Sequence, residues 1–110
     1  ALISHLPIII SAALLRTVGK EPNQQIKELA QKLASSGFAD TTRIGGGNPQ
    51  LGTSMASSNS KAILNGISSY RYSLELLEKA ILQGNWPELT KELELTKALR
   101  PNFVNSQNQT

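Results

Sequence analysis

Residues 63–81 read ILNGISSYRYSLELLEKAI, and this stretch decides the fold. Its large apolar residues recur at alternating spacings of four and three, at Ile63, Ile67, Tyr70, Leu74, Leu77 and Ile81, with Leu64 and Leu76 beside them. Such spacing predicts a helix with an apolar seam that runs along one face for about three heptads. Asn59 or Ser60 can cap its start, and Gly84 can end it.

The seam has two interpretations. It either packs inside a small helical bundle or joins two copies of the chain, because a domain of 110 residues has limited core to cover wide apolar helices. The second such helix is expected at residues 2–18, which are apolar nearly all round and are therefore predicted to be buried on all sides. Pro7 should kink this helix or cost it a hydrogen bond, and Gly19 should end it.

Other segments complete an all-α fold of about five helices. Residues 22–37, PNQQIKELAQKLASSG, show one apolar face at helical spacing, and residues 85–88, NWPE, predict a capping box at the start of a last helix. Pro101 should stop that helix, and the polar tail after it is expected to fray. Between these helices, residues 38–54, FADTTRIGGGNPQLGTS, are rich in glycine and small polar residues and predict a loop.

Composition argues against several classes of function. There is no cysteine and only one histidine, so no metal site is expected. The net charge of +3 is spread along the chain without a basic stripe, which argues against nucleic-acid binding. The apolar stretch at residues 1–15 is shorter than the roughly 20 residues of a membrane span. The chain begins inside an apolar pattern without methionine, and we expect it to be a fragment of a longer protein.

Arg43 is the candidate binding residue of the glycine-rich segment. An arginine fork binds a carboxylate through two charge-assisted hydrogen bonds, and Asp40 is close enough in a turn to hold the guanidinium. A purely structural Asp–Arg pair is the alternative, just as His5 alone could be an ordinary core histidine. Gly45-Gly46-Gly47 lacks the lysine of a P-loop and the preceding strand of a dinucleotide site. These glycines are expected either to let the backbone come close to another group, with a bound ligand as the candidate, or to permit positive φ.

Two motifs resemble the C-terminal domain of prephenate/arogenate dehydrogenases. Residues 4–7, SHLP, are similar to the element that opens that domain, and residues 37–44, GFADTTRI, look like the family's G-F-x-D-T-T-R-I segment. The polar-proline pair at residues 48–49 and the two long last helices also match. The resemblance covers nearly the whole chain.

The resemblance implies that residues 1–110 form a helical substrate-binding and dimerisation domain. A Rossmann domain with the catalytic histidine would precede it, so the domain alone should be inactive. The whole enzyme would oxidatively decarboxylate arogenate or prephenate with NADP or NAD, on the route to tyrosine. Arg43 would bind a substrate carboxylate with Asp40 as its partner, and the other predicted substrate-binding residues are His5, Thr42 and Gly46. A homodimer through the helices is expected, in the cytoplasm or alternatively in a plastid.

Two departures from the family pattern bear on the substrate. Many prephenate-using relatives carry a second histidine in S-H-L-P-H, where this chain has Ile8, and a tryptophan nine residues after the arginine, where it has Gly52. A smaller, less basic pocket favours arogenate. A prephenate-specific NAD-dependent enzyme and a non-catalytic helical dimerisation module remain the alternatives. The choice between NAD and NADP would be set in the preceding Rossmann domain, and the sequence does not show whether tyrosine inhibits the enzyme.

Overall fold

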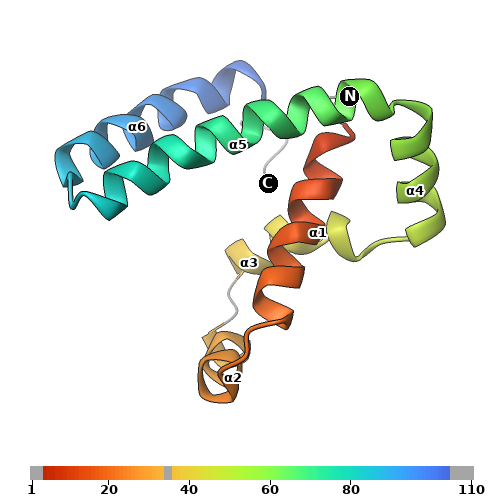
Figure 1. The fold of residues 1–110 in the computed structure, drawn as a ribbon, viewed down its shortest axis with the longest axis horizontal. Coiled ribbons are helices and arrows are strands. Elements are labelled where there is room, and N and C mark those ends of the chain that lie inside the picture. Colours follow the sequence, from red (N-terminus) through yellow and green to blue (C-terminus); the bar gives the residue numbers. More distant parts are fainter. Residues whose placement is uncertain (1–3, 34–35, 105–110) are drawn as a thin grey trace. The chain divides into compact units, whose positions relative to one another are not determined.

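The computed structural model describes residues 4–33 and 36–104, and every regular element in these ranges is a helix. This confirms the all-α prediction, with six α-helices in place of about five (Figure 1). The elements are α1 (Leu6–Gly19), α2 (Gln24–Leu33), α3 (Ser36–Thr42), the 3-10 helix η1 (Ile44–Gly46), α4 (Pro49–Ser58), α5 (Ser60–Leu82), α6 (Trp86–Leu99) and the 3-10 helix η2 (Arg100–Asn102). None of these helices is both long and apolar enough to cross a membrane.

The chain divides into two compact units, residues 1–68 and 69–110, with the boundary inside α5. The first unit contains α1 to α4, η1 and the start of α5. The second contains the rest of α5, α6 and η2. The candidate site described below lies wholly within the first unit.

Helix α1 begins later than the sequence predicted. It starts at Leu6 with His5 as its N-cap, so Pro7 falls in the first turn. Proline costs nothing there, because the first N–H groups of a helix have no partner within it. The predicted kink at Pro7 is therefore wrong, and residues 2–3 of the predicted helix lie outside the described residues. Gly19 does end the helix, as expected.

The expectation that α1 is buried on all sides is also wrong for this chain. Only Leu6 and Ser11 are buried, residues 8–10 are half-buried, and Ala12 and Ala13 are exposed. The physical reason is that α2, α3 and η1 are the main elements that contact α1, and they are too short to surround it. The uncovered surface of α1 is available to other parts of an assembly.

The predicted loop at residues 38–54 is largely helical, which corrects the sequence interpretation. In α3 the hydroxyls of Thr41 and Thr42 each donate to the carbonyl four residues back, at 2.7 Å. In α4 the Asn48 side chain accepts from the N–H groups of Gln50 and Leu51, at 2.9 and 3.2 Å, and Pro49 follows as a first-turn residue. The Asn48 cap therefore stabilises α4, and the two threonine hydroxyls find acceptors within α3 itself, so both segments are helical where composition disfavours helix.

The turn between α5 and α6 follows the predicted punctuation. Gly84 has φ of 63°, the Asn85 N–H donates to the Ala80 carbonyl at 2.8 Å, and the Gly84 N–H donates to Ile81 at 3.1 Å. This is a Schellman closure of α5. The Asn85 side chain accepts from the Glu88 N–H at 3.2 Å and caps α6. Only this half of the predicted capping box forms, because the Schellman closure already uses the Asn85 N–H.

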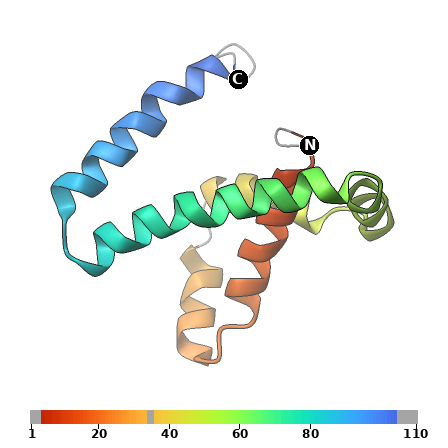
Figure 2. The ribbon, with the colours of Figure 1, turned by 45° about the horizontal axis from the view of Figure 1, so that its top comes forward.

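Most of the apolar seam is not covered within this chain. Ile63 is 5% exposed, whereas Leu74 is 51% exposed and Ile81 is 53% exposed. Leu93 and Leu95 of α6 are each 53% exposed, and α5 and α6 diverge from their turn in Figure 2. Burial inside a single-chain bundle therefore does not explain the seam, which leaves association with another surface as the better interpretation.

Candidate functional site

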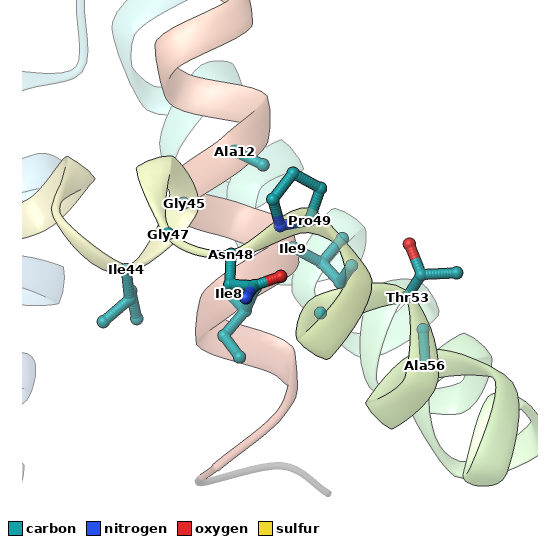
Figure 3. A pocket seen from close by; sticks show the side chains of 11 residues that line it. Ile8, Ile9, Ala12, Ile44, Gly45, Gly47, Asn48, Pro49, Thr53 and Ala56 are labelled. Atoms are coloured by element: carbon teal, nitrogen blue, oxygen red, sulfur yellow. The ribbon is translucent and has the colours of Figure 1, made fainter.

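The site is organised by a close contact between η1 and α1. The Gly45 N–H donates to the buried Ser11 Oγ at 2.9 Å, across 34 positions of sequence. A Cβ on Gly45 would lie 2.6 Å from that Oγ and still closer to the Ala12 nitrogen, so only glycine fits. Figure 3 shows Gly45 beside α1, next to Ala12. The close approach predicted at the glycines is therefore confirmed for Gly45, but its partner is helix α1 and not a ligand.

Two adjoining hollows lie where α1, η1 and the start of α4 meet. One has a volume of about 350 Å³ and is mainly apolar, and Figure 3 shows its lining side chains. The other has a volume of about 300 Å³ and includes Arg43. The residues that line both are Ile8, Ile44, Gly47, Asn48 and Gly52. Together they offer apolar walls, one amide and one cation.

Among the residues that the structure describes, Arg43 is the only charged one that lines either hollow. It is the N-cap of η1, with a helical backbone, and its side chain is exposed. Asp40 lies three residues earlier in α3 and is also exposed. The expected ion pair between the two stays a prediction.

Thr42 and Gly46 flank Arg43 but do not line the hollows. Thr42 is 7% exposed, and its hydroxyl donates to the Phe38 carbonyl at 2.7 Å, so its hydroxyl proton is used within α3. The Gly46 N–H donates to the Arg43 carbonyl at 3.2 Å. A Cβ on Gly46 would meet only Leu15, at 3.8 Å, so no packing constraint demands glycine there. Their predicted contacts with a substrate stay predictions.

His5 lies outside both hollows and contacts the start of α5. Its Nδ1 is 3.4 Å from Asn59 Nδ2, and the ring is half-buried. The contact joins His5 to the residue that precedes α5, and its donor and acceptor follow from the histidine tautomer.

The two departures from the family pattern lie against each other. A Cβ on Gly52 would be 3.8 Å from Ile8 Cγ2, and both residues line both hollows. A large side chain at position 52 would therefore compete with Ile8 for the same space beside Arg43. The sequence marked both positions, but it did not indicate that they face each other.

Sequence reasoning missed Ile44, Leu51 and Ser11 as parts of this region. Ile44 and Leu51 look like ordinary apolar helix residues, and Ser11 looks like a polar interruption of an apolar helix. Only the long-range contact between α1 and η1 gives these residues a place beside Arg43. No three side chains of the metal-ligating types Asp, Glu, His and Cys come together in the described part of the chain.

Comparison with known proteins shows the family of this chain. The family described as "Prephenate dehydrogenase, dimerization domain" matches residues 1–95. The crystal structure of Synechocystis arogenate dehydrogenase is similar, with a TM-score of 0.90 and 48% sequence identity over 93% of this chain. This chain spans 37% of that protein. The 110-residue chain therefore belongs to the prephenate dehydrogenase family, as its C-terminal dimerisation domain.

Proposed function

We propose that this domain binds substrate and forms the dimer interface of a dehydrogenase that oxidatively decarboxylates arogenate to tyrosine. One observation carries the proposal: in the described part of the chain, Arg43 is the sole charged residue beside an otherwise mainly apolar pair of hollows. The identity of 48% to an arogenate dehydrogenase supports the same substrate class.

Arg43 supplies the binding chemistry for a substrate carboxylate. Its guanidinium can donate two parallel hydrogen bonds to the two oxygens, and lysine cannot copy this geometry. The apolar walls from Ile8, Ile44 and Leu51 exclude water from one side of such a contact. A lower local dielectric strengthens the attraction between the two charges.

The charge of the hollows favours arogenate over prephenate. Both molecules carry two carboxylates, but the side arm of arogenate also carries an ammonium, so arogenate has one negative charge fewer. Ile8 and Gly52 add no cation to the single guanidinium. Prephenate-using relatives place a histidine at the first of these positions, which would supply a further polar contact for the pyruvyl arm. Prephenate-specific activity is the second candidate function.

The cofactor, NADP or NAD, is assigned to a separate domain of the parent protein. No strand occurs among residues 4–33 and 36–104, and Gly45 packs against α1, so these residues do not fit a dinucleotide site. When bound, the nicotinamide supplies the hydride acceptor. In this proposal the present chain contributes substrate binding and orientation, and it is inactive alone.

The dimer is assigned to the uncovered apolar seam of α5 and the apolar residues of α6. Leu74, Ile81 and Leu93 are each about half exposed. Apolar surface of this extent on two neighbouring helices marks an interaction site in a folded protein. The family's description as a dimerisation domain supports a second copy of the chain as the partner.

The test is reduction of NAD or NADP by the full-length parent protein, with arogenate and prephenate offered in turn. We expect turnover of arogenate and little turnover of prephenate. Turnover of prephenate alone would favour the second candidate and contradict the specificity argument. Activity with neither substrate would leave a dimerisation module without an enzymatic role.

A substitution of Arg43 tests the binding role separately. Arg43→Lys should lower kcat/KM by about 30- to 150-fold, because a bidentate contact worth roughly 2 to 3 kcal/mol becomes a point charge. Arg16→Lys is the matched control, since Arg16 is exposed on α1 and lines neither hollow. Unchanged turnover in Arg43→Lys would remove Arg43 from the substrate site.

A further inference from the structure

Ser11 makes a contact that the substrate-binding residues alone do not explain. It is 2% exposed within α1, yet its hydroxyl faces η1 and accepts the Gly45 N–H at 2.9 Å. The first N–H groups of a short 3-10 helix have no partner inside it. Ser11 therefore supplies the acceptor for this N–H from a distant part of the sequence.

The same contact fixes how closely η1 approaches α1. A Cβ added to Gly45 would lie 2.5 Å from the Ser11 carbonyl carbon and nearer still to the Ala12 nitrogen. Real side chains do not tolerate such distances to backbone atoms, so the two segments are in contact without spare room. The hydrogen bond and the missing side chain together hold η1 at one position on α1.

Arg43 lies in the segment that this contact holds. Its carbonyl accepts the Gly46 N–H at 3.2 Å, one residue beyond the held glycine. On its other side, Thr42 is 7% exposed and bonded to Phe38. The backbone is thus held on both sides of Arg43, at Thr42 and at Gly45. The Arg43 side chain remains exposed beside the hollow of about 300 Å³.

We propose that Ser11 is a positioning residue that holds the Arg43 guanidinium in its substrate-binding place by bonding the Gly45 N–H. This inference rests on the proposed function, in which Arg43 binds a substrate carboxylate. Without the Ser11 hydroxyl, η1 populates displaced positions, and the apparent affinity falls in proportion to the fraction that remains competent. Ser11 does not touch the reacting atoms, so the rate of the bound complex is preserved.

The test uses the full-length dehydrogenase and its preferred substrate. Ser11→Ala should raise KM about tenfold and leave kcat within about twofold, since one hydrogen bond to a partly buried N–H is lost. Thr17→Ala is the matched control, because the Thr17 hydroxyl lies on the same helix and bonds only to the Ala13 carbonyl. A purely structural role of Ser11 would reduce thermal stability with KM unchanged, and that result would overturn the proposal.

A double-mutant cycle separates this proposal from the one on which it depends. If Ser11 acts through Arg43, Ser11→Ala should raise KM no further once Arg43→Ala is present. Equal effects in both backgrounds would overturn the positioning role while leaving Arg43 as the carboxylate ligand. An Arg43→Ala variant with unchanged KM would overturn the binding role of Arg43, and the positioning role with it.

Hydrogen exchange gives a readout that needs no variant to fold. In the native full-length protein, the Gly45 amide should exchange at least about tenfold more slowly than in an unstructured peptide, because Ser11 holds it. Exchange at the unstructured rate would overturn the proposal whatever the kinetics of the variants.

Discussion

Leu74→Glu should split the dimer without unfolding the domain. Leu74 lies in the middle of the α5 seam and is 51% exposed in the single chain. In a separated chain, a glutamate at this position can reach water along the exposed side. In a tightly packed core the same substitution would unfold the domain. At this half-exposed position it should instead weaken the association of two chains.

The magnitude follows from the surface that association would cover. Burying a leucine completely contributes roughly 1.5 to 3 kcal/mol, so covering the exposed half contributes about 1 kcal/mol. A symmetric dimer contains two such leucines, so the substitution should remove about 2 kcal/mol of association free energy. The dissociation constant would then rise about 30-fold. Burial of two carboxylates without partners adds to this loss, so the 30-fold figure is a lower bound.

The assay is sedimentation of the full-length protein as a function of concentration, together with circular dichroism of the same samples. Ser73→Glu is the control, because Ser73 is exposed and the substitution introduces the same charge beside the seam. We expect Leu74→Glu to sediment as a monomer at concentrations where wild type and Ser73→Glu are dimers, with equal helicity in all three. A Leu74→Glu dimer of undiminished affinity would refute the assignment of the interface to this seam.

Substitutions at three further positions test the turn, the α4 cap and the substrate preference. Gly84→Ala places a side chain at φ of 63°, which costs about 1 to 2 kcal/mol of stability. The melting temperature should fall by about 4 to 8 °C for each kcal/mol lost. Gly19→Ala is the control, because there is open space around an added Cβ, and it should leave the melting temperature unchanged. Asn48→Ala should cost about 1 kcal/mol of stability, because the cap of α4 is lost. Asn48→Asp should keep the cap and the stability. It should raise KM, because it puts a carboxylate into the hollow that includes Arg43, the proposed ligand of the substrate carboxylate. Ile8→His should raise kcat/KM for prephenate relative to arogenate in paired assays, and an unchanged ratio would contradict the role given to that position.

The long helices could be predicted because their signals are local. The four-three spacing from Ile63 to Ile81 predicted α5, which the structure shows at Ser60–Leu82. Gly84 marked its end through a backbone conformation that other residues rarely adopt. Asn85 capped α6 as its sequence suggested. In each case the residues that determine the feature lie within one or two turns of it, so a single sequence contains the whole cause.

The segment around Arg43 could be predicted only in part. Thr41, Thr42 and Asn48 disfavour helix by composition, yet the two threonine hydroxyls donate to carbonyls of α3 and the Asn48 side chain caps α4. Such side chains compete with helical hydrogen bonds in one geometry, whereas in another they bond to a helix without ending it or cap its first turn. Composition therefore predicted a loop where the actual bonding produced two short helices.

The role of Gly45 shows why the site needed the structure. A run of three glycines indicated close approach, and the sequence interpretation assigned that approach to a ligand. In the structure the approaching partner of Gly45 is the backbone of α1, and Ser11 supplies the acceptor from 34 positions away. A serine inside an apolar helix is locally unfavourable, because a buried hydroxyl costs free energy unless it is hydrogen-bonded. The Gly45 N–H removes that cost by donating to the Ser11 hydroxyl. One hydrogen bond beside Arg43 therefore accounts for both the serine in the apolar helix α1 and the glycine in η1.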